Sequence, residues 1–81
     1  MRLERKIFKR GATYRPKRDF VSGNSTFIAG ESIVFDRDGY SHYDDCFVYE
    51  FHGAKGEPKV WIMPIDQPEG SWVDFFAEAS P

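Results

Sequence analysis

Apolar positions along most of the chain recur with the period of short β-strands. Residues 46–52 alternate, with Phe47, Tyr49 and Phe51 on one face. Residues 59–65 (KVWIMPI) form a returning strand, and the runs 12–21 and 31–36 also fit strands, with Ile33 and Phe35 pointing inward in the second. Clusters of turn residues at 22–25, 37–45 and 53–58 separate these runs. Short strands with regular turns predict a sandwich or barrel.

The C-terminal residues follow a helical period instead. Trp72, Phe75, Phe76 and Ala79 are spaced for one face of a helix, and Ser71 before them is a good N-cap. We therefore predict a mostly β fold, a small SH3-like five-stranded barrel from Ala12 to about Ile65, closed at one end by a short C-terminal helix over Trp72–Ala79.

The N-terminal residues 2–10 (RLERKIFKR) fit two periods. Leu3 and Ile7 are spaced for one helical face, while Leu3, Arg5 and Ile7 alternate as a strand would. An isolated helix of this length is marginal in water. The expected organisation is a basic N-terminal arm over residues 1–11 and a barrel domain with its helix over residues 12–81.

Composition supports one small folded domain. The chain has 81 residues, near the lower limit for an unaided core, and aromatic residues make up 17% of them. The single cysteine, Cys46, excludes an internal disulfide and a zinc site built from cysteines. The first eighteen residues carry nine charges and no apolar run, so we expect no secretory signal, no membrane span and a cytoplasmic location.

Charge is distributed unevenly along the chain. Residues 1–18 hold eight basic side chains against Glu4 alone, while the remaining residues hold three basic and twelve acidic ones. Such asymmetry concerns partners and steering rather than the fold. The arm could bind phosphates, but the acidic body would repel a polyanion from the aromatic surface.

The segment 36–45 (DRDGYSHYDD) is the densest group of functional side chains. Its carboxylates could bind a metal, but Tyr40, Ser41 and Phe47 occupy three positions that a calcium-binding EF-hand loop reserves for other residues. A solvated loop whose aspartates make Asx-turns explains the same residues. We predict neither a metal nor a cofactor.

Catalysis by the two histidines, His42 and His52, is not expected either. Cys46 and His52 lie on the same strand face, but six residues of extended strand separate them by roughly 20 Å. A Cys–His dyad is therefore excluded, and Cys46 is expected to be a small buried hydrophobe. The chain is predicted not to be an enzyme.

The strands at 46–52 and 59–65 are apolar on both faces. Either the strands curl so that both faces are covered, as in small barrels, or one face is an interface that includes Val60 and Ile62. The predicted function is a non-catalytic protein-interaction module, with a protein partner or self-association and no membrane contact. One concrete version is a bacterial immunity or inhibitor protein, and the alternative is a nucleic-acid-binding barrel that uses the arm. The residues predicted to bind the partner are Arg2, Arg5, Lys6, Lys9, Arg10, Tyr40, His42, Tyr43, Asp44, Asp45, Val60 and Ile62.

Short motifs accompany this pattern: Gly-x-x-Tyr at 11–14, Gly-Glu-x-x-x-Phe at 30–35 and Tyr-Asp-Asp at 43–45. They resemble an uncharacterised family of small bacterial proteins. The chain departs from that family with Ile33 in an aromatic position, His42 in place of proline and Cys46 in place of glycine. It also lacks the paired tryptophan and Pro-x-x-Tyr of peptide-binding SH3 domains. The resemblance implies a fold and a bacterial source rather than an activity.

Overall fold

The computed structural model describes residues 7–64, 66–67 and 69–79. These residues contain seven strands and one short 3-10 helix, joined by turns and loops. The predominance of strands confirms the mostly β prediction. The strands are β1 (Thr13–Pro16), β2 (Phe20–Ser22), β3 (Ser25–Phe27), β4 (Ile33–Ser41), β5 (Cys46–His52), β6 (Pro58–Pro64) and β7 (Phe76–Glu78), and the 3-10 helix η1 spans Glu69–Asp74.

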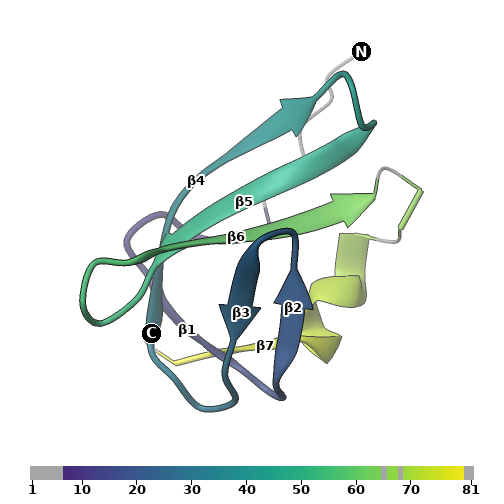
Figure 1. Ribbon diagram of the computed structural model, residues 1–81. Helices are drawn as coiled ribbons and strands as arrows, with labels where there is room; N and C mark the ends of the chain where they lie inside the picture. The colour runs from purple at the N-terminus through teal and green to yellow at the C-terminus, as the bar shows by residue number, and fades with distance from the viewer. Residues whose placement is uncertain (1–6, 65, 68, 80–81) are drawn as a thin grey trace.

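Five of the strands form one antiparallel sheet in the order β6-β5-β4-β1-β7, and β2 and β3 form a separate hairpin (Figure 1). Because β6 and β7 are the two ends of the sheet, the described strands do not close into a barrel, and the SH3-like barrel is not confirmed. The β2–β3 hairpin packs against β6 without a backbone ladder. The amide N–H groups of Val60 and Ile62 donate instead to the hydroxyl oxygens of Ser25 and Ser22, at 2.9 Å and 2.8 Å.

The predicted C-terminal helix over Trp72–Ala79 is wrong. The chain makes only the 3-10 helix η1 and then enters β7, which pairs with β1 so that Phe76 lies opposite Pro16. Pairing with a strand sixty residues away outweighs the local helical spacing, because it buries Phe76 and gives the backbone of residues 76–78 a ladder.

The predicted polar loop at 37–45 is also largely wrong. Strand β4 continues to Ser41, opposite Cys46 of β5, and only residues 42–45 form the turn. A register shift between Phe35 and Arg37 marks a β-bulge at Asp36. The bulge interrupts the alternation of apolar and polar residues, and that is why the sequence pattern resembles a loop.

The core is a continuous cluster of aromatic rings. Phe35, Phe47, Tyr49 and Phe51 are buried as predicted, and Cys46 is buried too. Phe8 lies at the centre of the cluster, with its ring centroid 5.0 Å from Tyr14, 5.1 Å from Phe51 and 5.5 Å from Phe76. Residues 1–6 of the expected arm lie outside the described residues, whereas Phe8 of the same segment is part of the core.

A tight turn directs the N-terminal segment into the core. The N–H of Gly11 donates to the carbonyl of Phe35 and the N–H of Phe35 donates to the carbonyl of Ala12, so the segment pairs with β4 up to this point. The N–H of Ala12 then donates to the carbonyl of Lys9, and Gly11 takes a positive φ of 81°. The turn leads residues 7–10 away from the edge of β4.

Candidate interaction surface

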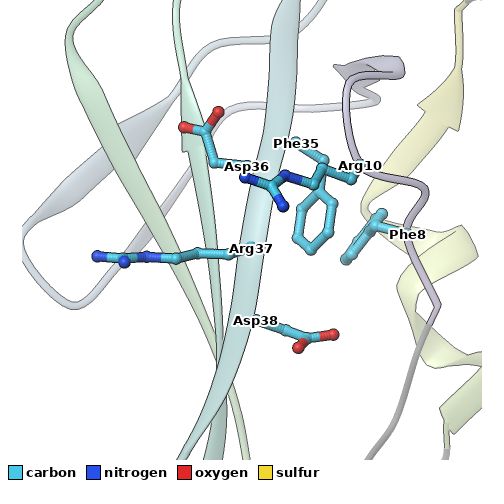
Figure 2. Close-up of a pocket in the computed structure, with 6 residues that line it drawn as sticks. All are labelled: Phe8, Arg10, Phe35, Asp36, Arg37 and Asp38. Carbon is cyan, nitrogen blue, oxygen red and sulfur yellow. The ribbon is translucent and has the colours of Figure 1, made fainter.

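A cavity of about 370 Å³ opens where the N-terminal segment leaves β4. Two of its residues, Phe8 and Arg10, come from that segment, and the others come from the bulged part of β4: Phe35, Asp36, Arg37 and Asp38. Figure 2 shows the side chains of Phe8, Phe35, Arg10 and Asp38 on one side of β4, with those of Asp36 and Arg37 turned to the other side. The cavity therefore has an aromatic floor and one side chain of each charge at its rim.

The two charged side chains on the outer side of β4, Asp36 and Arg37, each pair with a side chain of β5. The Arg37 guanidinium donates to the carboxylate of Glu50 at 2.9 Å and 3.4 Å. The Nδ1 atom of His52 lies 2.8 Å and 3.0 Å from the two carboxylate oxygens of Asp36. Across the described residues no ion pair joins Arg10 or Asp38 to another side chain. These two charges at the cavity rim are the ones available to a ligand.

The hydrogen-bonding direction of β4 beyond the bulge follows from its neighbours. The N–H groups of Val60 and Ile62 point away from β5, so the residues that alternate with them, such as Trp61, bond to β5. Trp61 lies opposite Tyr49, so Val48 and Glu50 must bond to β4, where they face Gly39 and Arg37.

The backbone N–H and C=O groups of Asp38 and Tyr40 consequently point away from β5, to the opposite edge of β4. Strand β1 pairs with β4 only at Ile33 and Val34, and no other described strand lies against this stretch. Within the part of the chain that the structure covers, β4 thus has an open edge from Arg37 to Ser41, next to the cavity.

The turn at 42–45 carries this edge to an exposed tip. The side chain of Tyr43 is fully exposed. The Tyr40 hydroxyl donates to the carboxylate of Asp45 at 2.8 Å, and this hydrogen bond, together with desolvation and the carboxylate charge, raises the pKa of Tyr40. The His42 ring stands edge-on to Tyr40 at 5.0 Å. The tip therefore combines one exposed aromatic ring with the exposed carboxylates of Asp44 and Asp45.

The structure separates the predicted binding residues into three groups. Tyr40, His42, Tyr43, Asp44 and Asp45 lie together at the distal end of the β4–β5 hairpin. Arg10 lines the cavity and Lys9 beside it is exposed, while Arg2, Arg5 and Lys6 lie outside the described residues.

Val60 and Ile62 form the third group, on the outer face of β6. Ile62 is 38% exposed and stands opposite Val48 of β5, and its Cδ1 would lie 3.1 Å from a Cβ placed on Gly23. Val60 is half-buried and stands opposite Glu50. These two side chains point away from Trp61 and the core, so they do not contribute to the cavity.

Three residues of the cavity are not identified by the sequence as members of a site: Phe8, Phe35 and Asp38. Phe8 lies within a run of basic residues, so nothing in its local pattern distinguishes it from the arm. Asp38 points to the same side as Phe35 because the bulge shifts the alternation by one residue. No signal in a single sequence reports such a shift.

Groups with catalytic or metal-binding potential are sparse in the described residues. His52 and Asp36 form a pair, but no hydroxyl or thiol among the described side chains hydrogen-bonds to His52. The same residues contain no group of three His, Cys, Asp or Glu side chains that could hold a metal ion. In the described part of the chain, no helix has the length and apolarity to cross a membrane.

The chain shares its fold with a known protein from bacteria. An integron cassette protein from the mobile metagenome of Vibrio cholerae superposes with a TM-score of 0.71, over 96% of this chain and 92% of that chain, at 16% sequence identity. No protein-family model matches the sequence, and no curated protein does. At this identity the likeness establishes the fold alone, and membership of the family suggested by the short motifs stays a prediction.

Proposed function

We propose that the protein is a non-catalytic protein-interaction module whose docking surface is the distal half of the β4–β5 hairpin. The observation that carries the proposal is the open edge of β4, which runs from the cavity at the bulge to the exposed ring of Tyr43. Exposed tyrosines are frequent anchors in protein interfaces, because a large amphipathic ring loses little conformational entropy when it is buried.

The charge of this hairpin indicates a basic partner. Residues 37–50 contain one basic side chain, Arg37, against Asp38, Asp44, Asp45 and Glu50. Complementary charge speeds the encounter of two proteins and disfavours partners of like charge. An immunity or inhibitor protein that neutralises a basic target is one concrete version of this function.

Site-specific photocrosslinking tests the proposal. Tyr43 is replaced by benzoylphenylalanine, and the protein is irradiated in a lysate of the cells that produce it. We expect a discrete protein adduct that weakens as salt is raised, because the charges are exposed. The matched control carries the same group at Val73, which is exposed and lies in η1, outside the sheet. The proposal fails if position 43 gives no protein adduct, or the same adducts as position 73.

A nucleic-acid-binding module is the second candidate, and one observation favours it. The exposed cations Lys9, Arg10, Arg15, Lys17 and Arg18 lie within ten residues on and beside β1, and the guanidinium of Arg18 lies 4.9 Å from the ring centroid of Phe75. A gel shift at low salt that weakens steeply as salt rises would support this candidate, and Arg15→Ala with Lys17→Ala should abolish it. Absence of a shift at low salt would remove it.

A further inference from the structure

We propose that the open edge of β4 takes up an extended segment of its partner as an added antiparallel strand, and that it selects a segment in which an apolar residue and a basic residue stand two positions apart. This inference rests on the proposed function and specifies the partner of that surface. Strand addition uses main-chain hydrogen bonds for affinity and alternate side chains for specificity.

The backbone supplies the main-chain part. Asp38 and Tyr40 each turn one N–H and one C=O to the open edge, a total that corresponds to two residues of a regular antiparallel ladder. The turn at Lys9–Ala12 keeps residues 7–10 off this stretch of β4, so the approach of a strand is not blocked by them. An added strand would extend the five-stranded sheet only on this distal half.

The side chains supply the selection. On the inner face of β4, one side chain of an added strand would lie beside Asp38. The next side chain on that face, about 7 Å nearer the bulge, would lie at the mouth of the cavity, because Gly11 and Ala12 occupy the edge of β4 at Phe35 itself. The aromatic rings of Phe8 and Phe35 at the cavity floor favour an apolar side chain. The Asp38 carboxylate at the rim, which has no ion-pair partner in the described residues, favours a lysine or arginine.

Charge also decides between a foreign segment and a second copy of this chain. Pairing of β4 with β4 of another molecule would bring two hairpins together that each carry four acidic side chains and one basic one. Like charges across an interface are unfavourable, so the β4 strand of a second copy is excluded and the occupant is a basic segment of the partner. The same repulsion excludes a nucleic-acid strand from this edge.

The test uses a synthetic peptide, acetyl-Ser-Thr-Val-Thr-Lys-Thr-Val-Thr-Ser-amide, whose symmetric pattern serves either strand direction. We expect saturable binding by fluorescence anisotropy, and NMR shifts with slowed amide exchange at Asp38 and Tyr40. A peptide with glutamate in place of lysine should bind at least tenfold more weakly. A peptide N-methylated at the lysine and at the valine two residues before it should also lose about tenfold, because the N–H groups of these two residues face Asp38 and Tyr40 and are lost as donors.

Two variants at position 38 separate the contribution of the backbone N–H to peptide binding from that of the carboxylate charge. Asp38→Asn keeps the amide N–H and removes the carboxylate, so we expect about two- to fivefold weaker binding, as for an exposed ion pair. Asp38→Pro also removes the N–H at the open edge, and since this N–H does not bond to β5, the β4–β5 ladder is retained. We expect Asp38→Pro to lose more than tenfold while its thermal transition stays cooperative.

Three results would overturn the inference. The first is that the peptide does not bind the wild-type protein, in which case the crosslink at Tyr43 still decides the proposed function separately. The second is equal binding by Asp38→Pro and wild type, or NMR shifts centred on Val60 and Ile62 instead. The third is a dimer in sedimentation without peptide that Asp38→Pro abolishes, which would make a second copy the occupant.

Discussion

The reactivity of Cys46 is determined by its position at the start of β5. Only 5% of the residue is exposed. Burial raises the pKa of the thiol, and the carboxylates of Asp44 and Asp45 raise it further. The thiolate is the reactive form, so less of the nucleophile is present at neutral pH than in an unfolded chain.

This environment predicts slow modification of the thiol. In the folded protein at pH 8, Cys46 should react with a disulfide reagent at least tenfold more slowly than in denaturant, both because access is restricted and because the pKa is raised. The rate is followed by absorbance of the released thiolate. A rate in native buffer equal to that in urea would show that Cys46 is not buried and that the pKa of its thiol is not raised.

The backbone of Asp45 is the second feature that belongs to a single residue. Asp45 has a φ of 48°, in the left-handed region that disfavours side chains with a Cβ, although aspartate tolerates it better than most. Its carboxylate also accepts the hydrogen bond from the Tyr40 hydroxyl. The positive φ therefore destabilises the hairpin, whereas the hydrogen bond from Tyr40 stabilises it.

Two substitutions separate these contributions. Asp45→Gly and Asp45→Ala both remove the carboxylate, but only alanine keeps the Cβ. We expect Asp45→Ala to be less stable than Asp45→Gly by about 1 kcal/mol in urea unfolding, because glycine adopts a positive φ at little cost. Equal stabilities would argue that the turn changes its conformation when the hydrogen bond to Tyr40 is lost.

At the scale of elements, the edge of β6 is protected by side chains of the β2–β3 hairpin. Ser22 and Ser25 accept hydrogen bonds from two amide N–H groups of β6 that would otherwise be left exposed at the sheet edge. A second tie joins the same elements, because Lys59 Nζ donates to the carbonyl of Thr26 and to Glu31 Oε2 at 3.0 Å. The hairpin therefore acts as a cover for β6.

Removal of the hydroxyls tests this cover. The double variant Ser22→Ala with Ser25→Ala should lose about 1–3 kcal/mol of stability, since each hydrogen bond contributes about 0.5–1.5 kcal/mol. Hydrogen exchange at the amides of Val60 and Ile62 should accelerate most. Ser32→Ala, at an exposed position before β4, is the matched control and should change neither quantity. Unchanged exchange in the double variant would mean that the serines do not hold the edge.

The elements also show how far a single sequence predicts this fold. Strand β5 follows a strict alternation, and the sequence predicts it correctly from Cys46 to His52. The prediction for the C-terminal segment is wrong because Phe75 and Phe76 fit a helical face equally well, and only the pairing of residues 76–78 with β1 makes this segment a strand. Local periodicity does not contain that information.

The candidate surface could be predicted only in part, for a related reason. The hairpin tip from Tyr40 to Asp45 is contiguous in sequence, and its polar and aromatic composition identifies it. The cavity joins Phe8 and Arg10 to a bulge in β4, and both the bulge and the turn at Gly11 arise from tertiary pairing. Sites that depend on a register shift require the three-dimensional structure.

At the scale of the whole molecule, one aromatic cluster stabilises the domain and Phe8 belongs to its centre. Phe8 is 7% exposed, and its ring contacts aromatic rings of the sheet and of η1. Truncation of a buried phenylalanine to alanine costs about 3–5 kcal/mol. A domain of this size has a small stability margin, so such a loss approaches the whole free energy of folding.

Two truncations therefore define where the folded domain begins. Removal of residues 1–6 should leave a cooperative thermal transition, whereas removal of residues 1–8 should abolish it, because the second truncation takes Phe8 out of the core. Circular dichroism in the near ultraviolet, which reports packed aromatic rings, provides the measurement. Phe8→Ala in the full-length chain should behave like the longer truncation, and Lys9→Ala, at an exposed neighbour, like wild type. A cooperative transition after removal of residues 1–8 would instead place the whole segment 1–11 in a dispensable arm.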